Sequence, residues 1–465
     1  MSRPWIEEWT PDDDVFWQSK GKAIARRNLA FSIFAEFLGF TVWVLWSVSA
    51  TKLNQAGFNF SDGQLFTLVA LPALVGAGVR VPYTLAVGRF GGRNWTVVSA
   101  GLLLLPVVLF TLLVTNPGTP YWAFLLGAAA AGLGGGNFAS SMANISYFYP
   151  DKRKGFALGL NAAGGNLGVA VSQLITPFVI AWGWLAVAGG SQGKSGGLYL
   201  QNAAFALVPF IIAAAAGAWL FMDNLKVSQS PIGEQLGVLK RRHTWTIAVL
   251  YIGSFGSFIG FSSAFPLLVK TQFPGITASL AFVGPLVGAF SRPAGGWLAD
   301  RLGGAKVTLW TFAAMLAVTL GVARSLTGGA SIHSYGLFLT MFIILFLLTG
   351  IGNGSTYRLI PEGFRRFHLT HPSIDQGLSA DQRLLQAKRE TGAAVGFIGA
   401  IGAFGGWLVP QSFGISTSAT GGPVAAFYLL AVFYLGCMGL TWWSQLRLAH
   451  SHSHEKVPAL AEAEA

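Results

Sequence analysis

The chain has 465 residues, of which 53% are hydrophobic and only 10% are charged, and its mean hydropathy is +0.55. Soluble domains carry about 25% charged residues, so this composition excludes an ordinary soluble domain and indicates a polytopic membrane protein. The net charge of +12 does not indicate a nucleic-acid partner, because 24 of the 30 lysines and arginines fall in segments on one predicted side of the membrane. This positive-inside bias predicts a multi-pass protein of the cell inner (cytoplasmic) membrane with both termini in the cytoplasm.

Residues 1–27 are polar and lack a short apolar stretch with a small-residue cleavage site, so we expect a cytoplasmic N-terminal tail and no cleaved signal peptide. Twelve apolar runs follow, each long enough to cross a hydrocarbon core about 30 Å thick. The first six form the predicted bundle 28–222 and are 28–50, 63–88, 95–115, 121–149, 155–182 and 199–222. After a polar cytoplasmic linker, 223–243, the second six form the predicted bundle 244–446 and are 244–269, 277–299, 306–326, 334–360, 391–415 and 422–446. Residues 447–465 are predicted to be a cytoplasmic tail.

Three sequence patterns occur once in each bundle and in the same order. They are GAGVR and GAFSR in spans 2 and 8, GLGGGNF and GIGNGST in spans 4 and 10, and GLNAAGGNLG and GFIGAIGAFG in spans 5 and 11. A repeat with a period of six helices around a central cytoplasmic loop describes the major facilitator architecture. The predicted fold is therefore an all-α membrane protein with twelve transmembrane helices in two pseudo-symmetric six-helix halves and a substrate site between them.

Arg80 and Arg292 are the most informative residues in these spans. Each stands nine residues before an arginine of the following charged turn, which places it about 13 Å below that turn, near the middle of the membrane. A cation at that depth is costly and by default indicates a functional site. Alternatively, each arginine is neutralised by a buried acid and only holds helices together. Away from their edges the spans contain one carboxylate, Glu36, so at least one positive charge stays unmatched, and an anionic substrate would balance it.

Three further side chains are candidates with open alternatives. Phe138 follows a glycine-rich run and, taken alone, fits a core residue. Asn166 could donate to an anion or to a neighbouring helix. Glu36 could be a neutral hydrogen-bonded acid, an ion-pair partner, or a proton carrier, because burial favours its protonated form and a nearby arginine its charged form.

The sequence offers little support for an enzyme or a cofactor-binding protein. The match to G-x-S-x-G at 189–193 lies in a loop with no strand-to-helix elbow, so we interpret it as chance. The sequence contains no metal-ligand cluster and no P-loop. We therefore expect no enzymatic activity, no catalytic residues, no metal and no cofactor.

The same stretches resemble the NarK family of nitrate/nitrite transporters within the major facilitator superfamily, and the resemblance covers essentially the whole chain. In the first half it includes FNFSDGQLF, RVPY around Arg80, FGGRNW, AGLGGGNFASSMANISYFYP and ALGLNAAGGNLG. In the second half it includes YIGSFGSFIGF, KTQFP, GAFSRPAGGWLADRLGG and GFIGAIGAFGGWLVP.

The resemblance implies a secondary active transporter of nitrate, and of nitrite, that alternates access around two arginines. By motif position, Arg80 and Arg292 would bind the anion, Phe138 and Tyr251 would sandwich its planar face, and Asn166 would be an additional donor. The implied partners are nitrate and nitrite anions and the lipid bilayer, with no nucleic acid, and monomers are usual for this superfamily.

The coupling mechanism is open in the sequence. Family members that exchange nitrate for nitrite need no proton site, whereas others resemble proton–nitrate symporters. Because exchange does not require an acid such as Glu36, its presence favours proton-coupled nitrate uptake. The alternatives are nitrate/nitrite antiport without proton coupling and a sensor that binds nitrate without moving it. An organophosphate antiporter is disfavoured, because it would be expected to carry more cationic and fewer aromatic side chains at the site.

Overall fold

The computed structural model describes residues 5–183, 190–192, 197–229, 237–276, 278–327, 334–370 and 379–447. Most of the predicted C-terminal tail, 448–465, lies outside the described residues, as do 230–236 of the predicted linker and the first four residues of the N-terminal tail. The limits predicted for tails, linker and bundles stay predictions.

The described residues are almost entirely helical. In the first half the helices are α1 (Asp14–Phe16), α2 (Lys22–Trp43), α3 (Leu45–Leu53), α4 (Asp62–Phe90), α5 (Gly92–Leu102), α6 (Leu104–Thr115), α7 (Tyr121–Ala131), α8 (Leu133–Phe148), α9 (Asp151–Val179), α10 (Asn202–Phe205) and α11 (Val208–Phe221). In the second half they are α13 (Arg242–Tyr251), the π-helical turn η5 (Ile252–Gly256), α14 (Ser257–Gln272), α15 (Val283–Leu302), α16 (Gly304–Thr327), α17 (Tyr335–Thr370), α18 (Ala380–Ala403), α19 (Gly405–Thr420) and α20 (Val424–Thr441).

Some spans are interrupted and consist of two or more consecutive helices. Counted in this way, the helices form the twelve predicted spans. Among the described residues, ten helical segments are long and apolar enough to cross a membrane. The other two spans are α7 with α8, and α15. Three consecutive glycines and Asn137 make α8 less apolar, and Arg292 does the same for α15. The two least apolar spans thus include two of the candidate site residues, Phe138 and Arg292.

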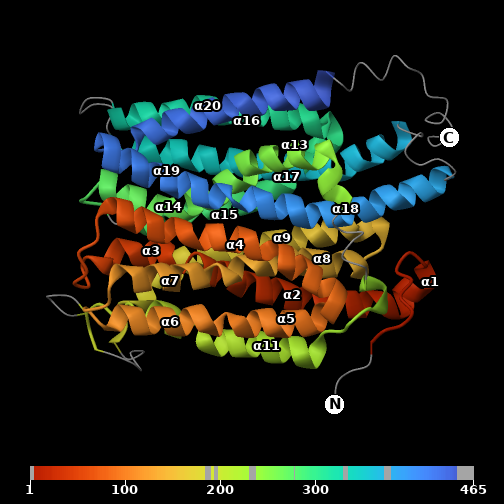
Figure 1. The fold of residues 1–465 in the computed structure, drawn as a ribbon, viewed down its shortest axis with the longest axis horizontal. Helices are drawn as coiled ribbons and strands as arrows, with labels where there is room; N and C mark the ends of the chain where they lie inside the picture. The colour runs from red at the N-terminus through yellow and green to blue at the C-terminus, as the bar shows by residue number, and fades with distance from the viewer. Residues whose placement is uncertain are drawn as a thin grey trace.

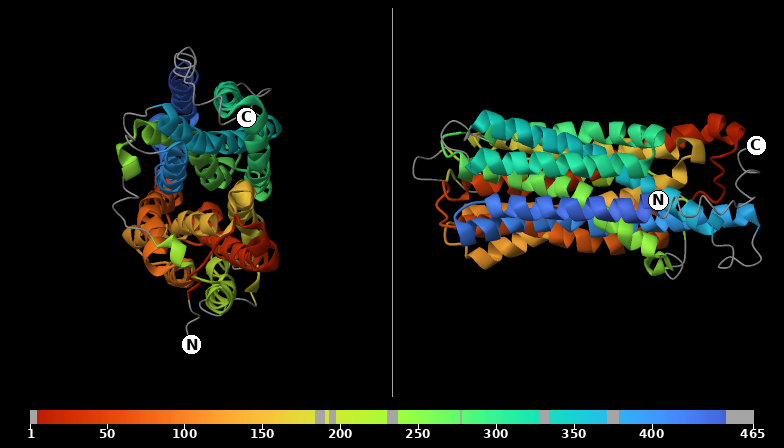
Figure 2. Two further views of the ribbon diagram at one scale, coloured as in Figure 1. Left: turned by 90° about the vertical axis from the view of Figure 1, so that its right-hand side faces the viewer. Right: turned by 90° about the horizontal axis from the view of Figure 1, so that it is seen from above.

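The helices lie side by side in two groups. Figure 1 shows α1–α11 in one layer and α13–α20 in the other, and the end-on view in Figure 2 separates the same two groups. The starts of α13 and α18 and the end of α11 share one end of the bundle with α1, here called the linker end (Figure 1). There α17 and α18 run on into the polar stretch 362–389, so part of this stretch is helical.

Glycines allow the arginine-bearing helices to pack closely against their neighbours in both halves. A Cβ atom on Gly135 of α8 would lie 3.0 Å from Cα of Gly76 of α4. In the second half, a Cβ atom on Gly350 of α17 would overlap with the carbonyl oxygen of Gly288 of α15. Such close approach needs a residue without a side chain. Glycines therefore let the same two helices approach closely in each half, although Gly135 and Gly350 are not at equivalent positions of the repeat.

A second pair of glycine contacts joins α9 to α2 and α18 to α13. A Cβ atom on Gly165 would overlap with the carboxyl group of Glu36, and a Cβ atom on Gly402 would overlap with the ring of Tyr251. Gly165 and Gly402 are 237 residues apart, the offset of the GLNAAGGNLG and GFIGAIGAFG patterns. Glu36 and Tyr251 therefore occupy pseudo-equivalent positions.

Hydrogen bonds join the halves near the end opposite the linker end. The Ser47 hydroxyl of α3 donates to the carbonyl oxygen of Ser263 in α14 at 2.7 Å. The Gln173 amide of α9 donates to the Ser47 hydroxyl at 3.1 Å and to the carbonyl oxygen of Ser262. Because these groups are buried, water does not compete for the bonds. We call them the far-end latch.

We expect Gln173→Ala to loosen the far-end latch. Buried hydrogen bonds between membrane helices contribute about 1 kcal/mol, so the ratio of separated to closed molecules should rise on the order of fivefold. Spin labels at Gln55→Cys and Gly275→Cys, with Cys437→Ala, would report the distance between the exposed ends of α3 and α14.

The matched control is Thr41→Val, because the Thr41 hydroxyl donates only within the first half, to Phe37 and Gly168 carbonyl oxygens. Identical distance distributions for Gln173→Ala and wild type would show that the latch does not hold this end closed.

We also expect Gly165→Ala to destabilise the protein, because the added methyl group collides with Glu36. Overpacking of this kind costs about 1–3 kcal/mol, so the midpoint of thermal unfolding in detergent should fall. Gly159→Ala in the same helix is the control, because a Cβ atom there meets nothing within 4 Å. Equal midpoints for the two variants would contradict the packing described here.

Candidate functional site

Arg80 is fully buried between the two halves. Its Nε donates to the carbonyl oxygen of Gly135 in α8 at 3.0 Å, and its Nη1 donates to that of Gly399 in α18 at 2.6 Å. Its Cζ lies 4.8 Å from the ring centre of Phe138 and 5.3 Å from that of Trp43. Carbonyl dipoles and aromatic faces thus solvate this cation without neutralising it.

Arg292 is also buried, with 6% of its surface exposed. Its Nη2 donates to the Tyr251 hydroxyl at 3.3 Å. Its Cζ lies 5.5 Å from the ring centre of Tyr357 and 5.8 Å from that of Phe138. Phe138 is therefore close to both guanidinium groups and lies where the two halves meet.

The aromatic rings stack through a residue that the sequence did not single out. Phe138 stacks on Phe255 at 5.8 Å between ring centres, and Tyr251 stacks on Phe255 at 5.1 Å. Tyr251 ends α13 and Phe255 lies in the π-helical turn η5. A π turn is wider than an α turn and is frequent at functional sites. Phe138 and Tyr251 do not stack directly on each other in this conformation.

Three buried donors beside these rings, and one more on α9, have no hydrogen-bond partner within the described part of the chain. They are Arg80 Nη2, Arg292 Nη1, Asn166 Nδ2 and the Tyr357 hydroxyl. Leaving a buried donor unpaired costs about 1–3 kcal/mol, and more for a charged group. An anion with several oxygen acceptors is the species that such a set of donors can bind.

Glu36 is fully buried on α2 and interacts electrostatically with both Arg292 and Arg80. It forms no ion pair with either within the described part of the chain. Its Oε2 accepts from Asn161 Nδ2 at 2.9 Å, and the same amide lies 2.7 Å from the Ser141 hydroxyl. Its Oε1 has no hydrogen-bond partner among the described residues. The carboxyl group is thus held by neutral groups within reach of the positive field of the arginines.

The structure brings Arg80, Arg292, Phe138 and Tyr251 together, with Glu36 within electrostatic range. Asn166 is buried on α9, and neither of its amide atoms has a hydrogen-bond partner among the residues that the structure describes. Whether these six residues bind substrate or carry protons stays a prediction.

Three neighbours of the site were missed from the sequence: Phe255, Tyr357 and Asn161. Each lies within or directly beside a pattern that was noted, namely YIGSFGSFIGF, GIGNGST and GLNAAGGNLG. The patterns identified the helices, and the structure shows which faces of those helices meet.

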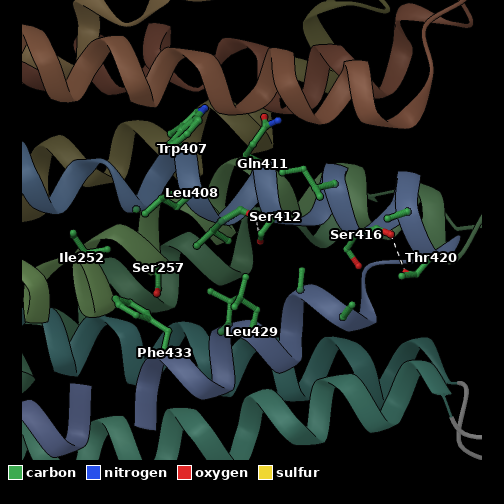
Figure 3. Close-up of a pocket in the computed structure, with 17 residues that line it drawn as sticks. Ile252, Ser257, Trp407, Leu408, Gln411, Ser412, Ser416, Thr420, Leu429 and Phe433 are labelled. Atoms are coloured by element: carbon green, nitrogen blue, oxygen red, sulfur yellow. Dashed lines mark hydrogen bonds between the residues drawn. The ribbon is translucent and has the colours of Figure 1, made fainter. Parts of the chain in front are cut away.

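An apolar groove of about 580 Å³ lies elsewhere, between α19, α20 and the start of α14. Figure 3 shows Leu408, Leu429 and Phe433 along it. None of the six predicted site residues lines it. Leu408 and Leu429 are also largely exposed on the outside of the bundle, so this groove faces the lipid and is separate from the arginine site.

Comparison with known proteins agrees with this architecture. The Major Facilitator Superfamily model matches residues 29–370. The nitrate/nitrite transporter NarU of Salmonella typhimurium is 46% identical over 94% of this chain and 95% of its own length. The probable nitrate/nitrite antiporter NarK2 of Thermus thermophilus is 36% identical over 95% of this chain and 97% of its own length.

The fold also has solved counterparts. The crystal structure of a bacterial homolog of the human lysosomal transporter Spinster, inward-facing and unoccupied, superposes with a TM-score of 0.61 at 16% identity, covering 91% of this chain and 97% of that chain. This likeness shows the fold alone. Together with the family match and the relatives, it means that this chain belongs to the major facilitator superfamily and, within it, to the NarK-type nitrate/nitrite transporters.

Proposed function

We propose that this protein carries nitrate, and also nitrite, across the cytoplasmic membrane by alternating access around Arg80 and Arg292. One observation carries the proposal: among the described residues, each buried guanidinium group keeps a nitrogen without a partner and neither group is paired with a carboxylate. An anion bound between them would balance the charge and satisfy both donors. The names of the NarU and NarK2 relatives support nitrate and nitrite as that anion.

The shape of the site suits a planar anion. Nitrate is flat and singly charged, so its face can lie against an aromatic ring while its edge accepts from guanidinium groups. Phe138, near both arginines, and Tyr251, which accepts from Arg292, offer such faces. In this conformation both rings stack on Phe255, so an anion lying between them would require Phe255 to move.

Glu36 is the proposed proton carrier. Its carboxyl group lies in the field of both arginines, and an anion bound there would cancel part of that field. The carboxyl group would then take up a proton when nitrate binds and release it when nitrate leaves. A proton gradient would thereby drive nitrate uptake.

Nitrate/nitrite antiport is the second candidate. The relative named a probable nitrate/nitrite antiporter, at 36% identity, favours it. In that case Glu36 would be a structural acid held by Asn161. In both candidates the distribution of basic residues supports cytoplasmic termini and, with them, a cytoplasmic linker end.

We expect Arg80→Lys and Arg292→Lys each to abolish nitrate transport while leaving expression intact. Lysine keeps the charge but lacks the planar fork, and each lost charge-assisted hydrogen bond costs about 1.5–3 kcal/mol. Nitrate uptake into proteoliposomes should fall on the order of a hundredfold or more.

Arg89→Lys is the control, because Arg89 is exposed near the end of the same helix α4. Wild-type uptake by either Arg80→Lys or Arg292→Lys would overturn the assignment of the anion site.

For coupling, we expect an inward proton gradient to drive nitrate uptake into proteoliposomes that contain no internal anion, and Glu36→Gln to lose this response. Glutamine has nearly the same shape but does not ionise. Asp62→Asn, at an exposed carboxylate that begins α4, should keep the response. Uptake that ignores the gradient and requires nitrite inside the vesicles would establish antiport instead.

A further inference from the structure

Tyr357 of α17 is a neighbour of the arginines with no role in the function proposed above. Its ring centre lies 5.5 Å from Cζ of Arg292 and 6.2 Å from the ring centre of Tyr251. Its hydroxyl is buried and has no hydrogen-bond partner within the described part of the chain. The Tyr251 hydroxyl, in contrast, already accepts from Arg292. Tyr357 therefore brings a free neutral donor to the cation.

Phe138 holds a similar place in the first half, although the repeat aligns it with Thr356, one residue before Tyr357. α17 packs against the arginine helix α15 as α8 packs against α4, in both pairs through glycines. In the first half, α8 places Phe138 4.8 Å from Cζ of Arg80, and in the second half α17 places Tyr357 5.5 Å from Cζ of Arg292. Each arginine thus has an aromatic ring from the glycine-rich helix of its own half. The hydroxyl group is the main chemical difference between these two rings.

We propose that the Tyr357 hydroxyl donates to an oxygen that nitrate has and nitrite lacks, and so makes this site prefer nitrate. The proposal rests on the arginine site binding these anions. Nitrate presents three oxygens, and nitrite presents two. The free nitrogens of Arg80 and Arg292 serve both anions alike, and Tyr357 adds a neutral donor, without a partner among the described residues, on a ring that lies against Arg292.

The preference follows from the cost of an unpaired donor. With nitrate bound, the Tyr357 hydroxyl gains an acceptor. With nitrite bound, it stays buried and unpaired. A site built to hydrogen-bond a group discriminates against an analogue that lacks the group, because its own polar atoms are then left without partners. Removing the hydroxyl should therefore weaken nitrate binding and leave nitrite binding almost unchanged.

The test is Tyr357→Phe in the full-length protein, purified in detergent and titrated calorimetrically with sodium nitrate and separately with sodium nitrite. We expect the dissociation constant for nitrate to rise about tenfold and that for nitrite to change less than about twofold. Retained nitrite binding also reports that the variant is folded. Tyr434→Phe is the matched control, because Tyr434 is buried in the same half and its hydroxyl donates to Ser257.

Two results would overturn the inference. An equal loss of affinity for both anions would make Tyr357 a general ligand, and unchanged nitrate affinity would remove it from the site. Either result leaves the proposed function standing if Arg80→Lys no longer binds nitrate. If Arg80→Lys and Arg292→Lys both bind nitrate like the wild type, the proposed function itself fails, whatever Tyr357→Phe does.

Discussion

Two guanidinium groups buried in a membrane protein are the constraint on which the rest of this structure depends. A charge in hydrocarbon is stable only if dipoles, rings or a counter-ion replace the water that it has lost. Arg80 obtains two backbone carbonyl oxygens and Arg292 obtains a tyrosine hydroxyl, while the rings around them add cation–π contacts. In the part of the chain that the structure describes, no carboxylate pairs with either guanidinium group, although Glu36 is within electrostatic range. A bound anion would therefore balance the charge of the two arginines and accept from their unpaired N–H groups.

The glycines make this arrangement possible. For Arg80 to reach the backbone of α8, the axes of α4 and α8 must approach closely, and a Cβ atom at Gly135 would prevent it. The second glycine contact places Glu36 and Tyr251 at pseudo-equivalent positions against Gly165 and Gly402. One position holds a group that can carry charge and the other holds a hydroxyl that accepts from Arg292. The two halves thus share a pseudo-symmetric backbone arrangement but carry chemically different side chains at these equivalent positions.

The sequence was sufficient for the fold and for the arginines. The apolar runs predict the number of spans. A charged residue within an apolar run is conspicuous in the sequence, so Arg80 and Arg292 can be found without a structure. The sequence does not show in the same way which side of each helix faces the site. Asn161 and Asn166 are five residues apart, which turns them by about 140° around a helix at 100° per residue, and only packing shows that Asn161 is the one that meets Glu36.

Aromatic residues were the hardest to place, because 36 phenylalanines and 10 tyrosines are distributed over the chain and nearly all would fit a core. Tyr251 and Phe255 are four residues apart, so the helical period places both rings on one face of the chain. It does not show that this face meets Phe138 of the other half, which is seen only in the structure.

The hydrogen bond from Arg80 to the Gly399 carbonyl oxygen joins the two halves at the level of the site. If the halves separate there, the bond breaks and the guanidinium N–H needs a new acceptor. Without a bound anion, the guanidinium N–H would be left unpaired during the conformational change. With an anion bound, an oxygen of the anion would accept the hydrogen bond. In the proposed transport cycle, the bond that closes the empty site would therefore also disfavour opening of the site without a bound anion.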